Sequence, residues 1–108
     1  MKVKDLSQLF QTVNIGDGER EIGDVFCCDL LSVAMGKAPS GCAWVTVMSN
    51  INTLAVASLA DVSAVILAEG AAADPSLTAK AAEQGISVFR TGEPVFRAAL
   101  SVYSRLPQ

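Results

Sequence analysis

The stretch CAWVTVM, residues 42–48, decides the fold class of this chain. It is rich in β-branched and aromatic residues and too short for a buried helix, so it predicts a buried β-strand. A second run of the same kind, SAVILA at 63–68, follows along the chain, and Asn50 and Asn52 offer N-caps for a helix through Ala60 between the two. A strand, a helix and a second strand in this order indicate a parallel sheet.

The same alternation continues on both sides of this pair. Residues 24–29 (DVFCCD) and 86–89 (ISVF) enclose two more short apolar runs that predict buried strands. Helices are predicted over 30–35 with Asp29 as cap, from Asp74-Pro75 to Gly85, and from Glu93-Pro94 onward. A short helix over 3–10 and a short strand over 12–14 come first. We therefore predict an α/β three-layer sandwich, with a mainly parallel sheet covered by helices on both faces.

Composition limits the class of protein. The chain has 108 residues, 51% of them hydrophobic, and a net charge of −3, which suits one compact domain. Its eight basic residues are scattered, so no nucleic-acid partner is expected. The most apolar window, 54–68, is interrupted by Asp61 and too short to span a bilayer, so no membrane partner is expected either. The first residues lack the apolar stretch of a signal peptide, and we expect a cytoplasmic protein.

The three cysteines are Cys27, Cys28 and Cys42. Their number is odd, two are adjacent, and their neighbours are apolar, so we expect three buried, reduced thiols. The chain has no histidine and no cysteine spacing of the zinc type. The sequence predicts no metal and no cofactor.

Motifs for catalysis are incomplete. Residues 36–41 (GKAPSG) hold the residue types of a phosphate-binding loop in the wrong order, and Gly16-Asp17-Gly18 begins a dinucleotide pattern in which Glu21 replaces the third glycine. Nucleophilic catalysis lacks a histidine base. We therefore expect that this protein is not an enzyme. A carboxylate-dependent enzyme using Asp24, Asp29 and Thr46 ranks third, behind the two non-enzymatic hypotheses given below.

Polar residues follow the predicted strands. Ligands of open α/β sheets bind at the carboxyl ends of the strands, so these residues form the predicted rim of a ligand site. Each of them also has a simpler explanation as a cap or a turn residue. The predicted ligand-binding residues are Asp29, Ser32, Thr46, Ser49, Asn50, Asn52, Thr53, Gly70, Arg90 and Thr91.

Two helices carry informative apolar faces. The helix over 30–35 is apolar almost all round, which indicates cover on more than one side. The sheet can cover one side, and either the first or last helix of the same chain or a second copy can cover the other; we predict the second copy, a homodimer. Its predicted interface residues are Leu30, Leu31, Val33 and Met35. In the last helix the apolar stripe expected to face the core is Phe96, Ala99, Leu100, Tyr103 and Leu106, with Arg97, Ser101 and Arg105 facing water.

These stretches together resemble the DRTGG domain. The matching residues are Val3-Lys4-Asp5-Leu6, Arg20-Glu21-Ile22-Gly23, Asp29-Leu30-Leu31-Ser32-Val33 with Met35, Trp44-Val45-Thr46, Asn52, Val56-Ala57, Val65-Ile66-Leu67, Gly70, Ala81, Gly85-Ile86, Val88, Thr91 and Phe96. Gly23-Asp24 departs from the usual Thr-Gly-Gly neighbourhood of the family. The resemblance covers nearly the whole chain and implies one DRTGG-like domain over 1–108.

The resemblance also implies a function. DRTGG domains are similar to the N-terminal domain of HPr kinase/phosphorylase, and beside other domains they look regulatory or dimer-forming. Our first hypothesis is therefore a non-catalytic regulatory module that dimerises and binds a small ligand, with nucleotides as one class. The alternative is a protein–protein adaptor, in a redox or signalling complex, without a small-molecule site.

Overall fold

The computed structural model describes residues 1–107 and contains one five-stranded sheet. The strand order is β1-β5-β4-β3-β2. The strands are β1 (Gln11–Asn14), β2 (Asp24–Cys27), β3 (Cys42–Thr46), β4 (Ala64–Leu67) and β5 (Val88–Arg90). Strands β2 to β5 are parallel, and β1 joins β5 antiparallel at one edge. The predicted, mainly parallel sheet is confirmed.

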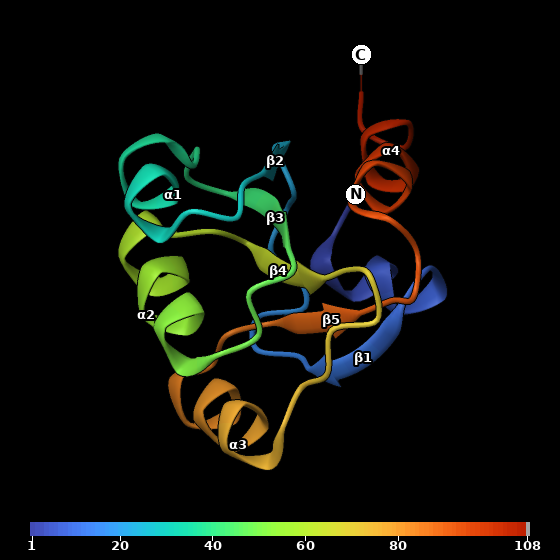
Figure 1. The fold of residues 1–108 in the computed structure, drawn as a ribbon. Helices are drawn as coiled ribbons and strands as arrows, with labels where there is room; N and C mark the ends of the chain where they lie inside the picture. Colours follow the sequence, from blue (N-terminus) through green and yellow to red (C-terminus); the bar gives the residue numbers. More distant parts are fainter. Residues whose placement is uncertain (108) are drawn as a thin grey trace.

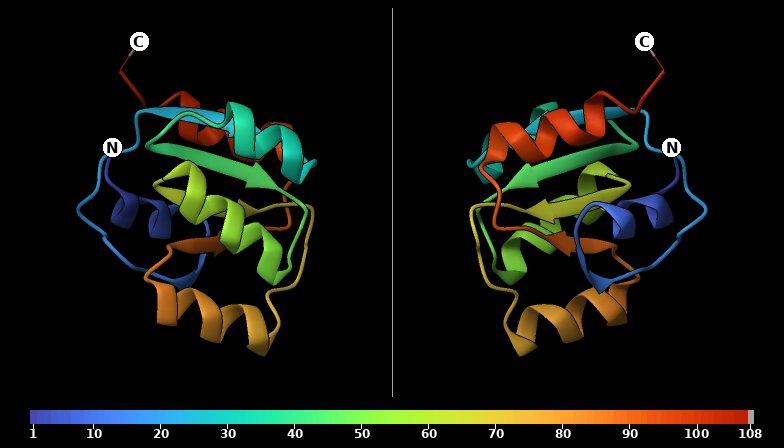
Figure 2. Two further views of the ribbon diagram at one scale, coloured as in Figure 1. Left: turned by 90° about the vertical axis from the view of Figure 1, so that its left-hand side faces the viewer. Right: turned by 90° about the vertical axis from the view of Figure 1, so that its right-hand side faces the viewer.

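Helices cover both faces of this sheet (Figures 1 and 2). One face carries α1 (Leu31–Lys37), α2 (Ile51–Ala60) and α3 (Pro75–Gln84), and the other carries the 3₁₀ helix η1 (Val3–Gln8) and α4 (Val95–Tyr103). The result is the predicted three-layer α/β arrangement. Strand β2 forms an open edge of the sheet, with α1 and α4 beside it on opposite faces.

Two hydrophobic cores separate the layers. Trp44, Leu54 and Leu77 belong to the core under α1, α2 and α3, while Ile66, Phe89 and Val102 belong to the core under η1 and α4. Every residue of β3 and β4 is buried because both faces of these strands are covered. This is why the two strands read as uninterrupted apolar runs.

Local signals set the ends of two helices. The Asp74 carboxylate accepts a hydrogen bond from the Leu77 amide at 2.8 Å, and Gly85 ends α3 with a φ of 68°. The Asn50 side chain accepts from the Asn52 amide at 2.9 Å at the start of α2. The predicted caps Asp74 and Asn50 are confirmed, whereas Asn52 lies within α2 and contributes only its backbone amide to the cap.

The predicted cap of α1 is wrong. Leu30 is the N-cap residue of this helix, and no side chain caps it. The carboxylate of Asp29 accepts hydrogen bonds from Thr46, the last residue of β3, and from Val47, which follows it, instead. Asp29 thus bonds residues that are distant in sequence instead of the nearby amides at the start of α1.

The predicted buried face of α4 is wrong for three of its five residues. Phe96, Leu100 and Tyr103 are 69%, 47% and 49% exposed, whereas Ala99 and Leu106 are buried as expected. The helix packs through Ala98, Ala99 and Val102 instead. Small side chains allow the helix to lie close to β2 and β3, and this leaves the larger stripe outside.

The cysteines also differ from expectation. All three are free thiols, but only Cys42 is buried; Cys28 is half-buried and Cys27 is exposed. Cys27 belongs to β2, and no further strand covers the outer side of β2. Its position at the sheet edge explains its exposure.

Candidate functional site

The carboxyl ends of β2 and β3 are joined by Asp29. Its Oδ1 accepts hydrogen bonds from the Thr46 hydroxyl at 2.7 Å and from the Val47 amide at 2.9 Å. Thr46 is fully buried, and its hydroxyl oxygen also accepts from the Met48 amide at 3.2 Å. The structure therefore brings together two of the predicted ligand residues, in a contact that links the loop after β2 to the end of β3.

The start of α2 uses three further predicted residues. The Thr53 hydroxyl, fully buried, donates to the Met48 carbonyl at 2.6 Å, and the Asn50 side chain caps the helix by accepting from the Asn52 amide. Ser49 is half-buried before this cap, and Ser32 is exposed on α1. The hydrogen-bonded members of this group stabilise the loop after β3.

A third group lies where β4 and β5 end. The Arg90 guanidinium donates to the carbonyls of Gly70 and Ala71 at 3.3 Å and to Oε1 of Gln11 at 3.2 Å. The Gly70 amide donates to the Thr91 carbonyl at 3.0 Å. Hydrogen bonds thus join the predicted residues in three groups that shape the loops, and the simpler explanation as caps and turns accounts for most of them.

One polar contact at this edge was not predicted. The Glu69 carboxylate accepts from the Val95 amide at 2.9 Å and so satisfies the first turn of α4. Glu69 has a φ of 59° in the loop after β4, and Val95 lies far along the chain. No spacing rule could have found this pair, because the sheet order alone brings the two loops together.

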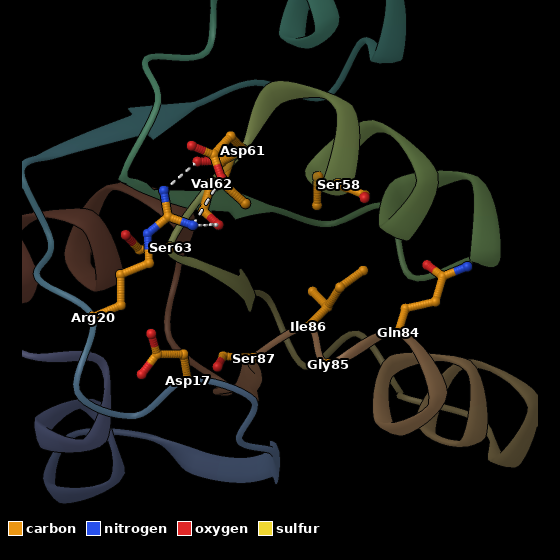
Figure 3. Close-up of a pocket in the computed structure, with 11 residues that line it drawn as sticks. Asp17, Arg20, Ser58, Asp61, Val62, Ser63, Gln84, Gly85, Ile86 and Ser87 are labelled. Atoms are coloured by element: carbon orange, nitrogen blue, oxygen red, sulfur yellow. Dashed lines mark hydrogen bonds and ion pairs between the residues drawn. The ribbon is translucent and has the colours of Figure 1, made fainter.

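A polar cavity lies at the opposite, amino-terminal end of the parallel strands (Figure 3). Its volume is about 160 Å³. Figure 3 shows side chains of the 17–20 segment facing the ends of α2 and α3 across it. The lining residues are Asp17, Arg20, Ala57, Ser58, Asp61, Val62, Ser63, Gln84, Gly85, Ile86 and Ser87.

An ion pair borders the cavity. Arg20 Nη1 lies 2.9 Å from Asp61 Oδ1, and Arg20 Nη2 donates to the Asp61 carbonyl at 2.8 Å. The Ser40 hydroxyl donates to Asp61 Oδ2 at 2.6 Å. The hydrogen bond from Arg20 and that from Ser40 lower the pKa of the Asp61 carboxyl. Asp61 is therefore ionised at neutral pH. The same residue ends α2, with a φ of 58°.

The size of the cavity limits what it could hold. Pockets for drug-sized ligands span about 300–1,000 Å³. A whole nucleotide is larger than this cavity of about 160 Å³. Sequence reasoning missed the site, and Arg20 in the degenerate family motif was its one available signal.

An apolar groove of about 260 Å³ lies on the α4 side of strand β2. It is lined by Val25, Cys27, Phe96, Ala99, Leu100 and Tyr103. On the other face of the same edge, Leu30, Val33 and Met35 are 63%, 37% and 51% exposed, and Leu31 is half-buried. The predicted interface residues of α1 thus have a counterpart on α4 that the sequence did not reveal.

Residues 1–107 contain neither a metal-binding cluster nor a membrane-spanning helix. Within residues 1–107, no group of three or more His, Cys, Asp or Glu side chains could hold a metal ion. None of the helices in that range has the length and apolar character needed to cross a membrane. No known family model and no curated protein matches this sequence. The DRTGG resemblance therefore stays a prediction.

Proposed function

We propose that this protein is a non-catalytic regulatory module that acts through self-association. The observation that carries the proposal is the concentration of exposed apolar side chains on both sides of strand β2. Phe96, Leu100 and Tyr103 lie on one face, and Leu30 and Met35 lie on the other. Large apolar surfaces on a small domain are typical of protein-binding sites.

The size of this surface suits a weak dimer. Aromatic side chains cover about 150–250 Å² each, so the exposed 69% of Phe96 and 49% of Tyr103 offer roughly 200 Å² together. The exposed parts of Leu30, Val33, Met35 and Leu100, together with the β2 edge, bring the total to on the order of 600 Å² per copy, the lower end for specific interfaces. We therefore expect a dimer that dissociates on dilution.

The polar groups support a non-catalytic role. Asp29 and Thr46, the residues of the enzymatic alternative, hydrogen-bond one another and the backbone. Asp24 bonds the amide of its neighbour Val25 at 2.8 Å. We expect no phosphotransfer by the isolated protein. ATP turnover by pure protein, abolished in folded Asp29→Ala, would contradict this.

Regulation by a small ligand is the second part of the proposal. The polar cavity bordered by Arg20 and Asp61 supports a ligand much smaller than a nucleotide. A ligand that binds only the folded state raises the midpoint of thermal unfolding. The test is a thermal-shift panel of nucleotides and small polar metabolites, with Arg20→Gln as the matched variant. A shift that persists unchanged in Arg20→Gln would exclude this cavity.

Light scattering over a concentration series tests self-association. We expect a dimer at high micromolar concentration, weakened by Met35→Glu and by Phe96→Glu. Leu59→Glu is the matched control, because Leu59 is 73% exposed on α2 and outside the proposed surface. A stable mass near 11 kDa at every concentration would reject the proposal and favour an adaptor for a different protein.

Membership of the DRTGG family and a cytoplasmic location belong to the same proposal. The first is supported by the residues that resemble the family motifs, in their order along the chain. The second is supported by three free thiols, since secreted proteins usually pair their cysteines. Fractionation of the producing cells would test the location.

A further inference from the structure

At the open edge of β2, Cys27 presents both its backbone N–H and its C=O to a partner. The Cys28 amide donates to the Val45 carbonyl at 3.3 Å, toward β3. Backbone groups alternate in direction along a strand, so the amides of Val25 and Cys27 face the open edge. The Val25 amide is already bonded to Oδ1 of Asp24. Cys27 is left to present its N–H and C=O outward.

An occupant of this edge must also cover both neighbouring helices. An extended peptide would pair with β2 but would leave the apolar residues of α1 and α4 exposed. A second copy of the chain brings its own β2, α1 and α4 together. A two-fold axis makes such a contact self-complementary, because each patch meets its own equivalent.

The direction of α4 fits this symmetry. The Val95 amide at the start of α4 bonds Glu69, which follows β4, so α4 begins at the carboxyl edge of the sheet and runs back against the parallel strands. A two-fold axis perpendicular to the sheet makes two β2 strands antiparallel and places both α4 helices on one face, with both α1 helices on the other. The groove beside Phe96 and Leu100 then meets the partner's α4.

We infer that two copies associate by antiparallel pairing of their β2 edges about a two-fold axis at Cys27, forming one continuous ten-stranded sheet (2 × 5 strands). Cys27 and the partner's Cys27 exchange two backbone hydrogen bonds, with Cα atoms about 5.5 Å apart. The apolar residues of α4 cover one another on one face, and those of α1 do so on the other. This inference rests on the proposed self-association and specifies its geometry.

Proline at the centre of the contact gives a direct test. Proline is tolerated on an edge strand when the amide it removes faces outward. Cys27→Pro should therefore keep the monomer fold while removing both hydrogen bonds across the axis, and Cys27→Ser is the matched control that keeps the amide. We expect wild type and Cys27→Ser to dimerise alike, and the dissociation constant of Cys27→Pro to rise roughly 30-fold.

Cross-linking tests the register independently. A short bifunctional thiol reagent should join two copies of Cys28→Ser through Cys27, but should not join two copies of the Cys27→Ser/Cys28→Ser double variant. The reaction needs alkaline pH, because burial and the nearby Asp29 charge raise the pKa of the Cys27 thiol. If Cys27→Pro does not fold, cross-linking tests the pairing of the β2 edges at Cys27 in its place.

The possible failures are distinguishable. A Cys27→Pro variant that folds and dimerises like wild type, with Leu100→Glu monomeric, would overturn edge pairing and leave self-association intact. Cross-linking that survives in the Cys27→Ser/Cys28→Ser double variant would likewise overturn the register. A wild type that is monomeric at all concentrations would overturn both the geometry and the proposed function.

Discussion

The Asp29 carboxylate accepts the hydroxyl hydrogen of Thr46 across 2.7 Å, and this contact joins the loop after β2 to the last residue of the neighbouring parallel strand β3. Thr46 is fully buried, so no water could replace Asp29 as the hydrogen-bond partner of its hydroxyl if Asp29 were removed. The contact holds the residues between β2 and α1 in place. The exposed residues of α1 therefore depend on it for their position beside the sheet edge.

Thr46→Val should destabilise the protein. Valine has the shape of threonine but leaves both the Asp29 carboxylate and the Met48 amide with one partner fewer. We expect a loss of about 1–3 kcal/mol in the free energy of unfolding, measured in urea. The control is Thr12→Val on exposed β1, expected within about 0.5 kcal/mol of wild type. Equal effects of the two substitutions would contradict the role of this contact.

Gly16→Ala should destabilise the protein while Gly23→Ala does not. A Cβ at Gly16 would collide with the Gly85 carbonyl, whereas a Cβ at Gly23 meets no atom within 4 Å. The atoms that a Cβ at Gly16 would meet belong to the backbone of Gly85, so no side-chain rotation can relieve the collision. Overpacking of this kind costs about 1–3 kcal/mol, which thermal unfolding would detect. Similar midpoints for the two variants would show that the loop can move away from α3.

Acid should weaken a contact near the N-terminus. Hydrogen bonds from Lys2 and Lys4, at 2.7 and 2.8 Å, lower the pKa of Glu19 to about 2. A carboxyl group with a lowered pKa in the folded state stabilises it above the unfolded pKa and loses this effect as the pH falls through the folded value.

At neutral pH the midpoint temperature of unfolding should therefore be higher for wild type than for Glu19→Gln. The difference between the two midpoints should shrink between pH 4.5 and 2. Because the three side chains are exposed, salt should shrink it as well. Scanning calorimetry at several pH values gives the measurement. A difference in midpoint that stays constant down to pH 2 would contradict this account.

Cys42 should be the least reactive thiol. Burial, with a smaller contribution from Asp24, raises its pKa to about 11. At pH 8 in the native protein we expect alkylating reagents to modify Cys27 and to spare Cys42, with all three thiols available in denaturant. Mass spectrometry of peptides would identify the sites. Rapid modification of native Cys42 would require β3 to open.

The sequence determined the elements whose signals are local. The continuous apolar runs of β3 and β4 show that both faces of these strands are buried. Asp74 with Pro75 and Gly85 mark the ends of α3 through bonds within a single turn. The fold class followed from these elements because helices that alternate with buried strands lead to a parallel sheet.

Only the tertiary structure decided the partners of Asp29, Arg20 and Glu69, which lie 17, 41 and 26 residues away in sequence. It also decided which face of α4 is buried. Two stripes of this helix have apolar residues at helical spacing, and the sheet accepts the one with the small side chains, Ala98 and Ala99. Strand order then left β2 at an edge, and Cys27 and Phe96 became exposed. Local propensity holds no information on strand order, because order depends on how the helices pack across the whole sheet.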